Sequence, residues 1–161
     1  MPGVIEVRGA KNGRVLTHER ETTGPPASLV LRPDRRNIFA ESEDVSVIAA
    51  EVVDAQGRLV PTASNEVTFR VDGPCRLIGI ANGDPSCHEP DKPSSLSQAK
   101  RSAFNGLCMA VVQTLKRTGE IRVAASANGL GGASIDKRRG DKAPSFGSLS
   151  YRRRQSFKDL A

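Results

Sequence analysis

The sequence predicts an all-β protein built as an antiparallel β-sandwich. Short segments in which apolar and polar residues alternate recur along the chain, and a period of two is typical of half-buried strands. Turn formers separate these segments, and the 161 residues include 15 Gly and 10 Pro. No stretch has the 3.6-residue periodicity of a helix, and about seven short strands at this spacing are typical of a sandwich.

The first predicted element is a β-hairpin within residues 1–23. Two alternating segments, 4–8 and 14–18, flank Lys11-Asn12-Gly13, and Asn-Gly between alternating segments is the strongest short-range hairpin signal. A lone two-stranded hairpin is marginally stable in water, so this one needs a surface on which to pack. Gly24-Pro25-Pro26 then predicts a stiff, extended linker.

The strands of the sandwich follow the linker. Residues 28–31 form the first of them, and residues 45–53 form the longest segment rich in β-branched residues. Ile48 begins an inward-facing alternation, whereas Val47 has the opposite phase, which requires either a bulge or burial on both faces near Ser46. The side chains expected to face the core are Ile48, Val52, Val67, Phe69, Ile121 and Val123.

The charge of the chain is unevenly distributed. Residues 1–133 hold 16 Lys and Arg against 15 Asp and Glu, whereas residues 134–161 hold 8 against 3. The formal net charge of +6 therefore belongs mainly to the C-terminal segment. This segment has few apolar residues, so residues 134–161 are predicted to be a disordered basic tail beyond a sandwich at 26–131.

A long polar loop separates the apolar segments 78–80 and 107–112. Asn82-Gly83 and Asp84-Pro85 are turn formers that end the first segment, and Asp84 is expected to cap its own turn. Prolines and serines within residues 90–95 then keep the chain irregular. A connection of this length is either functional or loosely ordered.

These residues carry a resemblance to a known family. Asn-Gly-Asp-Pro at 82–85, followed by His-Glu at 88–89 and Ala-Phe-Asn-Gly at 103–106, resembles the C-terminal immunoglobulin-like domain of bacterial glycoside hydrolase family 2 enzymes of the β-galactosidase type. The likeness includes the Val-Val-Asp-Ala-Gln-Gly turn at 52–57 and covers residues 26–130. It implies an immunoglobulin-like sandwich and a non-catalytic role in domain packing or at the rim of an active site.

The resemblance also implies a role for the loop and the hairpin. In this family both catalytic glutamates lie on an (α/β)-barrel domain, and this sequence has no strand-helix alternation, so no catalytic residue is predicted here. Residues 1–23 resemble the last two strands of a preceding β-domain, which would make the chain a fragment of a larger hydrolase. The loop is then expected to contact the parent catalytic domain, or a carbohydrate near it, through Asn82, Asp84, His88, Glu89, Phe104 and Asn105.

A free-standing adhesion or carbohydrate-binding module of the same fold is the alternative. The chain has no Trp and one Tyr, which disfavours sugar binding because pyranose rings usually stack on aromatic faces. A docking loop would leave residues 90–98 mobile without its partner, whereas a binding module needs the loop preorganised.

Other chemistry has little support in the sequence. Asp84, Cys87, His88, Glu89 and Asp91 form a dense group of potential metal ligands, but neither zinc nor calcium spacing is present, so no metal or cofactor is predicted.

The cysteines and the basic pairs exclude few kinds of binding partner. Cys75, Cys87 and Cys108 are an odd number, consistent with free thiols or with one disulfide. Basic pairs such as Lys100-Arg101 are expected to be solvated, and without interleaved aromatic residues they predict no specific nucleic-acid partner.

Targeting signals are also lacking. No apolar segment approaches the ~20 residues of a membrane helix, and the first residues do not have the pattern of a signal peptide. The resemblance implies a periplasmic or secreted bacterial parent enzyme.

Overall fold

The computed structural model describes residues 3–35, 38–39, 44–117, 119–137 and 139–140. Every regular element in this part of the chain is a β-strand, and no described helix is long and apolar enough to cross a membrane. The strands are β1 (Val4–Lys11), β2 (Arg14–Glu21), β3 (Ser28–Pro33), β4 (Ile38–Phe39), β5 (Val45–Val53), β6 (Glu66–Asp72), β7 (Cys75–Ala81), β8 (Gln98–Ser102), β9 (Leu107–Thr114), β10 (Ile121–Ala127), β11 (Ala133–Lys137) and β12 (Arg139–Gly140).

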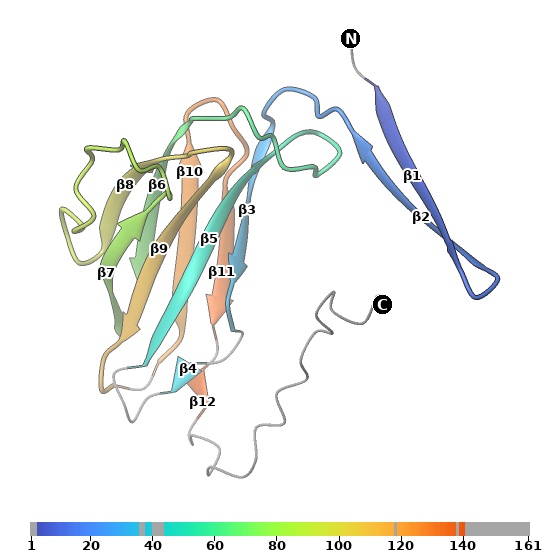
Figure 1. The fold of residues 1–161 in the computed structure, drawn as a ribbon. Coiled ribbons are helices and arrows are strands. Elements are labelled where there is room, and N and C mark those ends of the chain that lie inside the picture. The colour runs from blue at the N-terminus through green and yellow to red at the C-terminus, as the bar shows by residue number, and fades with distance from the viewer. Residues whose placement is uncertain (1–2, 36–37, 40–43, 118, 138, 141–161) are drawn as a thin grey trace.

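Two four-stranded antiparallel sheets form the body of the molecule, as Figure 1 shows. Their strand orders are β3-β5-β9-β7 and β11-β10-β6-β8, so that β7 and β8 are edge strands on the same side of the sandwich. The short strands β4 and β12 pair in parallel beside them. The predicted all-β, immunoglobulin-like sandwich is therefore confirmed.

The core lies between the two sheets. All six side chains that the alternation assigned to it are fully buried, including Phe69 of β6 and Ile121 of β10. Strand β5 pairs with β9 without a break in register, so there is no bulge near Ser46. Instead, Ser46 is buried on the inward face, and its hydroxyl donates a 2.6 Å hydrogen bond to Asp34.

Four further strands, β4, β8, β11 and β12, were not predicted. Strand β11 pairs with β10, and Ile135 packs partly buried against the core, so the expectation of an unstructured segment from Ser134 is wrong for residues 134–137. The apolar–polar alternation in β11 is short and runs into a basic sequence, so it was too weak to predict a strand there. The short strand β12 at 139–140 contradicts the expected disorder as well, and residues 138 and 141–161 of the predicted tail lie outside the described residues.

Strand β8 also interrupts what was expected to be one loop up to Gly106. It pairs with β6, and Asn105-Gly106 forms a tight turn, bridged by Phe104 and Leu107, through which the chain crosses to β9 in the other sheet. Both turn residues have positive φ, 51° and 79°, as a type I′ turn requires. Asn12-Gly13 has the same conformation between β1 and β2, which confirms the predicted N-terminal hairpin.

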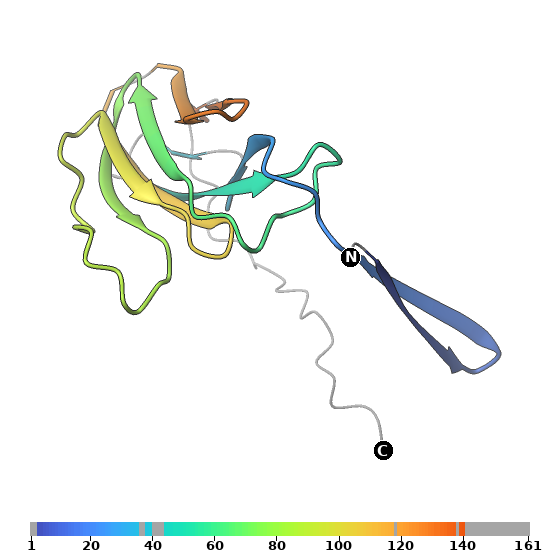
Figure 2. The same ribbon diagram turned by 90° about the horizontal axis from the view of Figure 1, so that it is seen from above.

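A buried carboxylate joins the hairpin to the sandwich. Asp54 is 1% exposed and accepts hydrogen bonds from the backbone N–H groups of Gly24, Gln56 and Arg58. The Arg58 guanidinium lies 2.8 Å from Asp54 and also forms an ion pair with Glu21 at the end of β2. The first residue of the linker and the end of the hairpin are thus fixed to one turn of the sandwich, while the rest of the hairpin projects away from it (Figure 2).

Candidate functional site: the loop anchored by Arg101

The loop at residues 82–97 covers the side of the sandwich at which both sheets end. It leaves β7, passes over the gap between the edge strands and enters β8 (Figure 1). Its carbonyl groups accept hydrogen bonds from the strands: Leu77 N–H donates to Leu96 at 2.7 Å, and Ile80 N–H donates to Asp91 at 3.0 Å. The loop therefore contacts its own sandwich at residues 91 and 96, and the mobility expected for residues 90–98 stays a prediction.

Arg101 of β8 anchors this loop from the interior of the sandwich. Strand alternation directs Ala99, Arg101 and Ala103 inward, and Arg101 is only 1% exposed. At the edge of the sheet, its guanidinium lies within hydrogen-bonding distance of the loop. The groups that accept its hydrogen bonds are the Ile80 and Pro90 carbonyls at 3.0 Å, Asp91 Oδ1 at 2.6 Å, and the Glu89 carbonyl and Cys87 Sγ at 3.2 Å.

These contacts make the loop and the arginine depend on each other. A buried charge is tolerated only when it is paired and hydrogen-bonded. The loop supplies most of the acceptors of Arg101, and in return the guanidinium binds the carbonyls of Glu89 and Pro90. Of the three guanidinium nitrogens, Nε has no hydrogen-bond partner among the described residues, although Glu89 Oε2 lies 3.7 Å away as an ion-pair partner.

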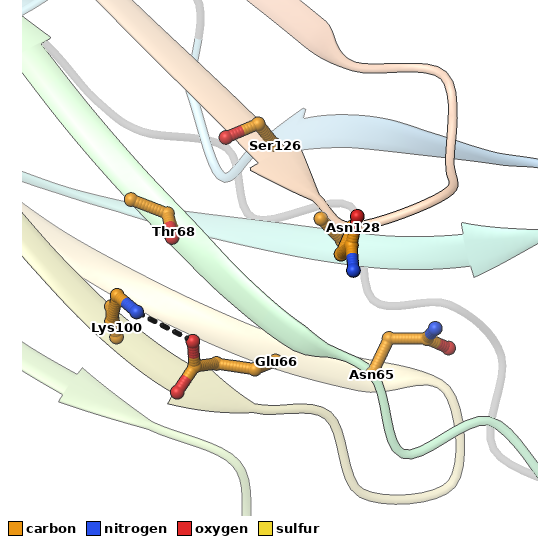
Figure 3. Close-up of a pocket in the computed structure, with 7 residues that line it drawn as sticks. Asn65, Glu66, Thr68, Lys100, Ser126 and Asn128 are labelled. Carbon is orange, nitrogen blue, oxygen red and sulfur yellow. Dashed lines mark hydrogen bonds and ion pairs between the residues drawn. The ribbon is translucent and has the colours of Figure 1, made fainter.

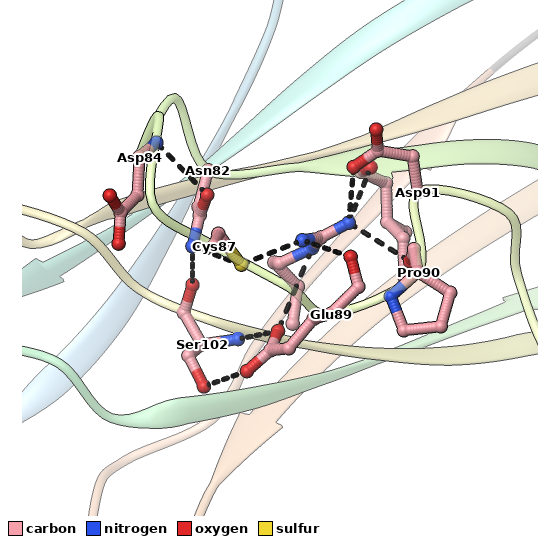
Figure 4. Close-up of polar contacts among 9 residues, drawn as sticks. Asn82, Asp84, Cys87, Glu89, Pro90, Asp91 and Ser102 are labelled. Carbon is pink, nitrogen blue, oxygen red and sulfur yellow. Dashed lines mark hydrogen bonds and ion pairs between the residues drawn. The ribbon is translucent and has the colours of Figure 1, made fainter.

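Glu89 and Asn82 connect the loop to Ser102, which follows Arg101 on β8. The Glu89 carboxylate accepts hydrogen bonds from both the N–H and the hydroxyl of Ser102, and these bonds lower the pKa of Glu89. Asn82 Nδ2 donates to the Ser102 carbonyl at 3.0 Å, while its side-chain oxygen accepts from Asp84 N–H at 3.1 Å. Figure 4 shows these side chains directed toward one another across the loop.

Asp84 caps its own turn, as the sequence predicts. Its Oδ1 accepts 2.8 Å hydrogen bonds from the N–H and the hydroxyl of Ser86. Both bonds favour the ionised form, so they lower the pKa of Asp84, and the nearby His88 contributes in the same direction. Asp84 therefore shapes the loop from within.

The six predicted contact residues fall into two groups. Asn82, Asp84 and Glu89 hold the loop together, whereas His88, Phe104 and Asn105 are exposed at its surface or in the adjacent β8–β9 turn. The sequence analysis missed Arg101 because Lys100-Arg101 was interpreted as a solvated pair. That interpretation is wrong for Arg101, and the Ala-Lys-Arg-Ser-Ala pattern at 99–103 contained the alternation that could have identified it.

A polar groove lies on the other side of β8. Lys100 points outward there and forms a 2.7 Å ion pair with Glu66 of β6, as Figure 3 shows. The groove has a volume of about 380 Å³. Because its two charges neutralise each other and no aromatic side chain lines it, it offers hydrogen bonds to a neutral ligand but no stacking surface. Its lining consists of Asn65, Glu66, Thr68, Lys100, Ser126, Ala127 and Asn128.

Neither site has the geometry of a metal centre. Among the described residues, no group of three or more His, Cys, Asp or Glu side chains is arranged to hold a metal ion. The five potential ligands of the loop are instead distributed along it: Asp91 and the Cys87 thiol contact Arg101, whereas Glu89 binds Ser102. Cys75, Cys87 and Cys108 are all free thiols.

Comparison with known proteins shows which family this sandwich resembles. Residues 29–136 match the family described as glycoside hydrolase family 2 C-terminal domain 5. Beta-galactosidase BoGH2A of Bacteroides ovatus is 36% identical over 131 residues, which are 80% of this chain and 15% of that protein. A beta-glucuronidase of Formosa agariphila is 31% identical over 121 residues, which are 74% of this chain and 12% of that protein.

Solved structures give the same result. A beta-glycosidase from Bacteroides vulgatus superposes with a TM-score of 0.75 at 29% identity, covering 86% of this chain and 17% of that one. A glycosyl hydrolase family 2 member from Bacteroides cellulosilyticus has a TM-score of 0.73 at 28% identity, covering 84% of this chain and 18% of that one. The chain thus spans less than one fifth of these relatives, and the match at residues 29–136 shows that it belongs to the glycoside hydrolase family 2 C-terminal domain 5 family.

Proposed function

We propose that this chain is a non-catalytic module of a larger glycoside hydrolase of family 2, in which it packs against other domains and contributes to the rim of the active site. The observation that carries this proposal is the engagement of the loop carboxylates within the sandwich. Asp84 binds Ser86, Glu89 binds Ser102 and Asp91 binds Arg101. These groups stabilise the loop and are not directed at a substrate.

The chemistry of glycoside hydrolysis supports the same reading. A retaining glycosidase needs two carboxyl groups about 5 Å apart on either side of the scissile bond, one as acid and base and the other as nucleophile. In the polar groove, Glu66 is paired with Lys100, and no second carboxylate lines the groove. The catalytic pair is therefore assigned to another domain of the parent protein.

The exposed residues indicate how the module would reach that domain. His88, Phe104 and Asn105 lie at one end of the sandwich on a loop and a turn that are internally braced. Residues 1–23 belong in this proposal to the last hairpin of the preceding β-domain, and the 36% identical beta-galactosidase supports a β-galactoside as the substrate of the parent enzyme.

The test compares this chain with the larger protein. The 161-residue chain should not hydrolyse chromogenic β-galactosides or β-glucuronides above the buffer rate. The sequence that precedes residue 1 should encode a family 2 barrel with its two glutamates, and removing residues 24–137 from that enzyme should lower its thermal stability. Hydrolysis by the repurified chain would contradict the proposal, and so would a preceding sequence without a hydrolase.

A further inference from the structure

The outer faces of the two sheets differ sharply in chemistry. On the β11-β10-β6-β8 sheet, the outward positions of β6 are Glu66, Thr68, Arg70 and Asp72, and the neighbouring strands add Lys100 and Arg122. Several of these charges are paired, as in the Lys100–Glu66 contact. The charged and polar side chains of this face are compatible with exposure to water, so the face does not need to be covered by another protein surface.

The β3-β5-β9-β7 sheet presents the opposite surface. Its central strand β9 directs Leu107, Met109 and Val111 outward, and β5 places Val47 opposite Val111. At the edge, the register shift between Leu77 and Gly79 turns Ile78 outward. Val47, Ile78, Leu107 and Met109 are each 36–41% exposed. We call this surface, with Ala49 and Ala81, the apolar face.

Small residues keep the apolar face open. Ala49 and Ala81 lie on either side of Met109, and Gly79 lies opposite Val111. A side chain at Gly79 would begin 3.5 Å from Val111 Cγ2 and cover it. Charged residues adjoin the face on two sides: Glu51, opposite Leu107, forms a 2.7 Å ion pair with Arg32, and Arg76 of β7 donates a 2.9 Å hydrogen bond to Gln113. The face therefore suits an uncharged, apolar partner surface.

We infer that the apolar face is the surface by which this module docks on a folded domain of the parent hydrolase; this inference rests on the function proposed above. Contiguous apolar surface on a soluble domain marks an interaction site. The relatives are more than five times as long as the part matched here, since it covers only 12–15% of the curated ones, so ample partner surface exists in such a protein.

The contacts that attach the hairpin and linker to the turn at Asp54 favour a partner in the same polypeptide over a second copy of this chain. Gly24 is fixed to Asp54 by a 2.9 Å hydrogen bond, and Glu21 is paired with Arg58. A domain that continues from β1 is therefore held close to the sandwich. Tethering of this kind raises the effective concentration of a neighbouring domain far above that of a separate molecule.

Met109 provides a direct test, because it is the one methionine besides Met1 and lies in the middle of the apolar face. Hydroxyl-radical labelling should oxidise Met109 readily in the 161-residue chain. In the enzyme that includes the preceding domains, Met109 should be protected, whereas a methionine-containing reference peptide added to both samples corrects for the radical dose. Equal oxidation of Met109 in the two proteins would overturn the docking face.

Two matched substitutions separate docking from folding. Val47→Lys places a charge on the apolar face, and Ser126→Lys places the same charge on the polar groove side. We expect Val47→Lys to lower the melting temperature of the whole enzyme and to abolish the protection of Met109 without affecting the isolated chain. Ser126→Lys should change neither protein, and an equal effect of both variants on the whole enzyme would contradict the inference.

Two outcomes distinguish the ways in which the idea can fail. If sedimentation shows the isolated chain to be a dimer that Val47→Lys dissociates, the occupant is a second copy and the inference is wrong while the proposed function stands. If the preceding sequence encodes no hydrolase, the proposed function itself fails, and the docking partner named here fails with it.

Discussion

Lys100 and Arg101 are neighbours on strand β8, yet one cation faces solvent and the other is enclosed by protein. The side chain of Lys100 is 58% exposed, whereas that of Arg101 is 1% exposed. Lys100 forms one ion pair on the surface of the sheet. Arg101 donates hydrogen bonds to three carbonyls, one carboxylate and one sulfur. Because side chains alternate along a strand, a shift of one position changes the role of the charge completely.

Arg101→Leu should release the loop and destabilise the fold. The substitution removes the donor to the Ile80, Glu89 and Pro90 carbonyls and the ion-pair partner of Asp91, and losing hydrogen bonds made by a charged group costs roughly 1.5–3 kcal/mol. Lys100→Leu is the matched control, because an exposed ion pair contributes about 0–1 kcal/mol. Urea denaturation measures both. Similar losses for the two variants would show that Arg101 does not anchor the loop.

Asp54 should give the protein a distinct dependence on acid. Burial acts to raise the pKa of Asp54, but hydrogen bonds from Gly24, Arg58 and Gln56 outweigh it and lower the pKa from 3.8 to about 2. A carboxyl group with a lowered pKa in the folded state stabilises the protein fully above its unfolded pKa. That contribution is lost as the pH falls from about 4 to about 2.

Asp54→Asn should therefore reduce stability near neutral pH and flatten the loss between pH 4 and 2. Denaturant unfolding at a series of pH values measures this effect, and the exposed Glu120→Gln provides a control. Parallel stability curves for the wild type and Asp54→Asn would contradict the assignment. The same variant should also weaken the attachment of the hairpin, because Arg58 loses one of its two carboxylate partners.

Gly106→Ala should be much more harmful than Gly83→Ala. Both glycines have φ near +78°, which costs alanine about 1–2 kcal/mol. A Cβ at Gly106 would also lie 2.4 Å from the Val60 carbonyl oxygen, whereas at Gly83 nothing lies within 4 Å. Overpacking adds roughly 1–3 kcal/mol. Thermal unfolding of the two variants tests this, and equal shifts in Tm would show that the β8–β9 turn can relax away from Val60.

The three cysteines should react in a fixed order. Burial raises the pKa of Cys108 to about 12 and that of Cys75 to about 11, and the thiolate is the reactive form. Cys87 is half-buried in the loop. Iodoacetamide at pH 8 should therefore modify Cys87 first and Cys108 last, as mass spectrometry of the native protein would show. Equal rates in denaturant serve as the control, and failure to label all three there would indicate a disulfide.

The sequence was sufficient for those parts of the fold that follow local rules. Alternation identified Phe69 and Ile121 as core residues, and the Asn12-Gly13 pair identified the N-terminal hairpin. It was insufficient where tertiary contacts decide. Strand β8 has only five residues and lies beside prolines and serines, so its pairing with β6 was not apparent from local composition.

The candidate site was predicted only in part for the same reason. The motif residues Asn82, Asp84 and Glu89 do lie in the loop network, but its centre is Arg101. A basic pair in a sequence normally indicates a solvated surface. Only the three-dimensional position of β8 at the edge of its sheet shows that one member of the pair enters the interior.

The covered edge of the sandwich has a consequence for the self-association of the chain. Exposed strand edges are templates for aggregation, and here the N–H groups of Leu77 and Ile80 on β7 are already bonded to loop carbonyls. Among the described residues nothing covers the hairpin in this way, since Ile5 and Leu16 are 71% and 67% exposed and β1 pairs with β2 alone. Aggregates formed by strand addition should therefore begin at residues 4–21, and lysines introduced there should improve solubility more than lysines introduced on the sandwich.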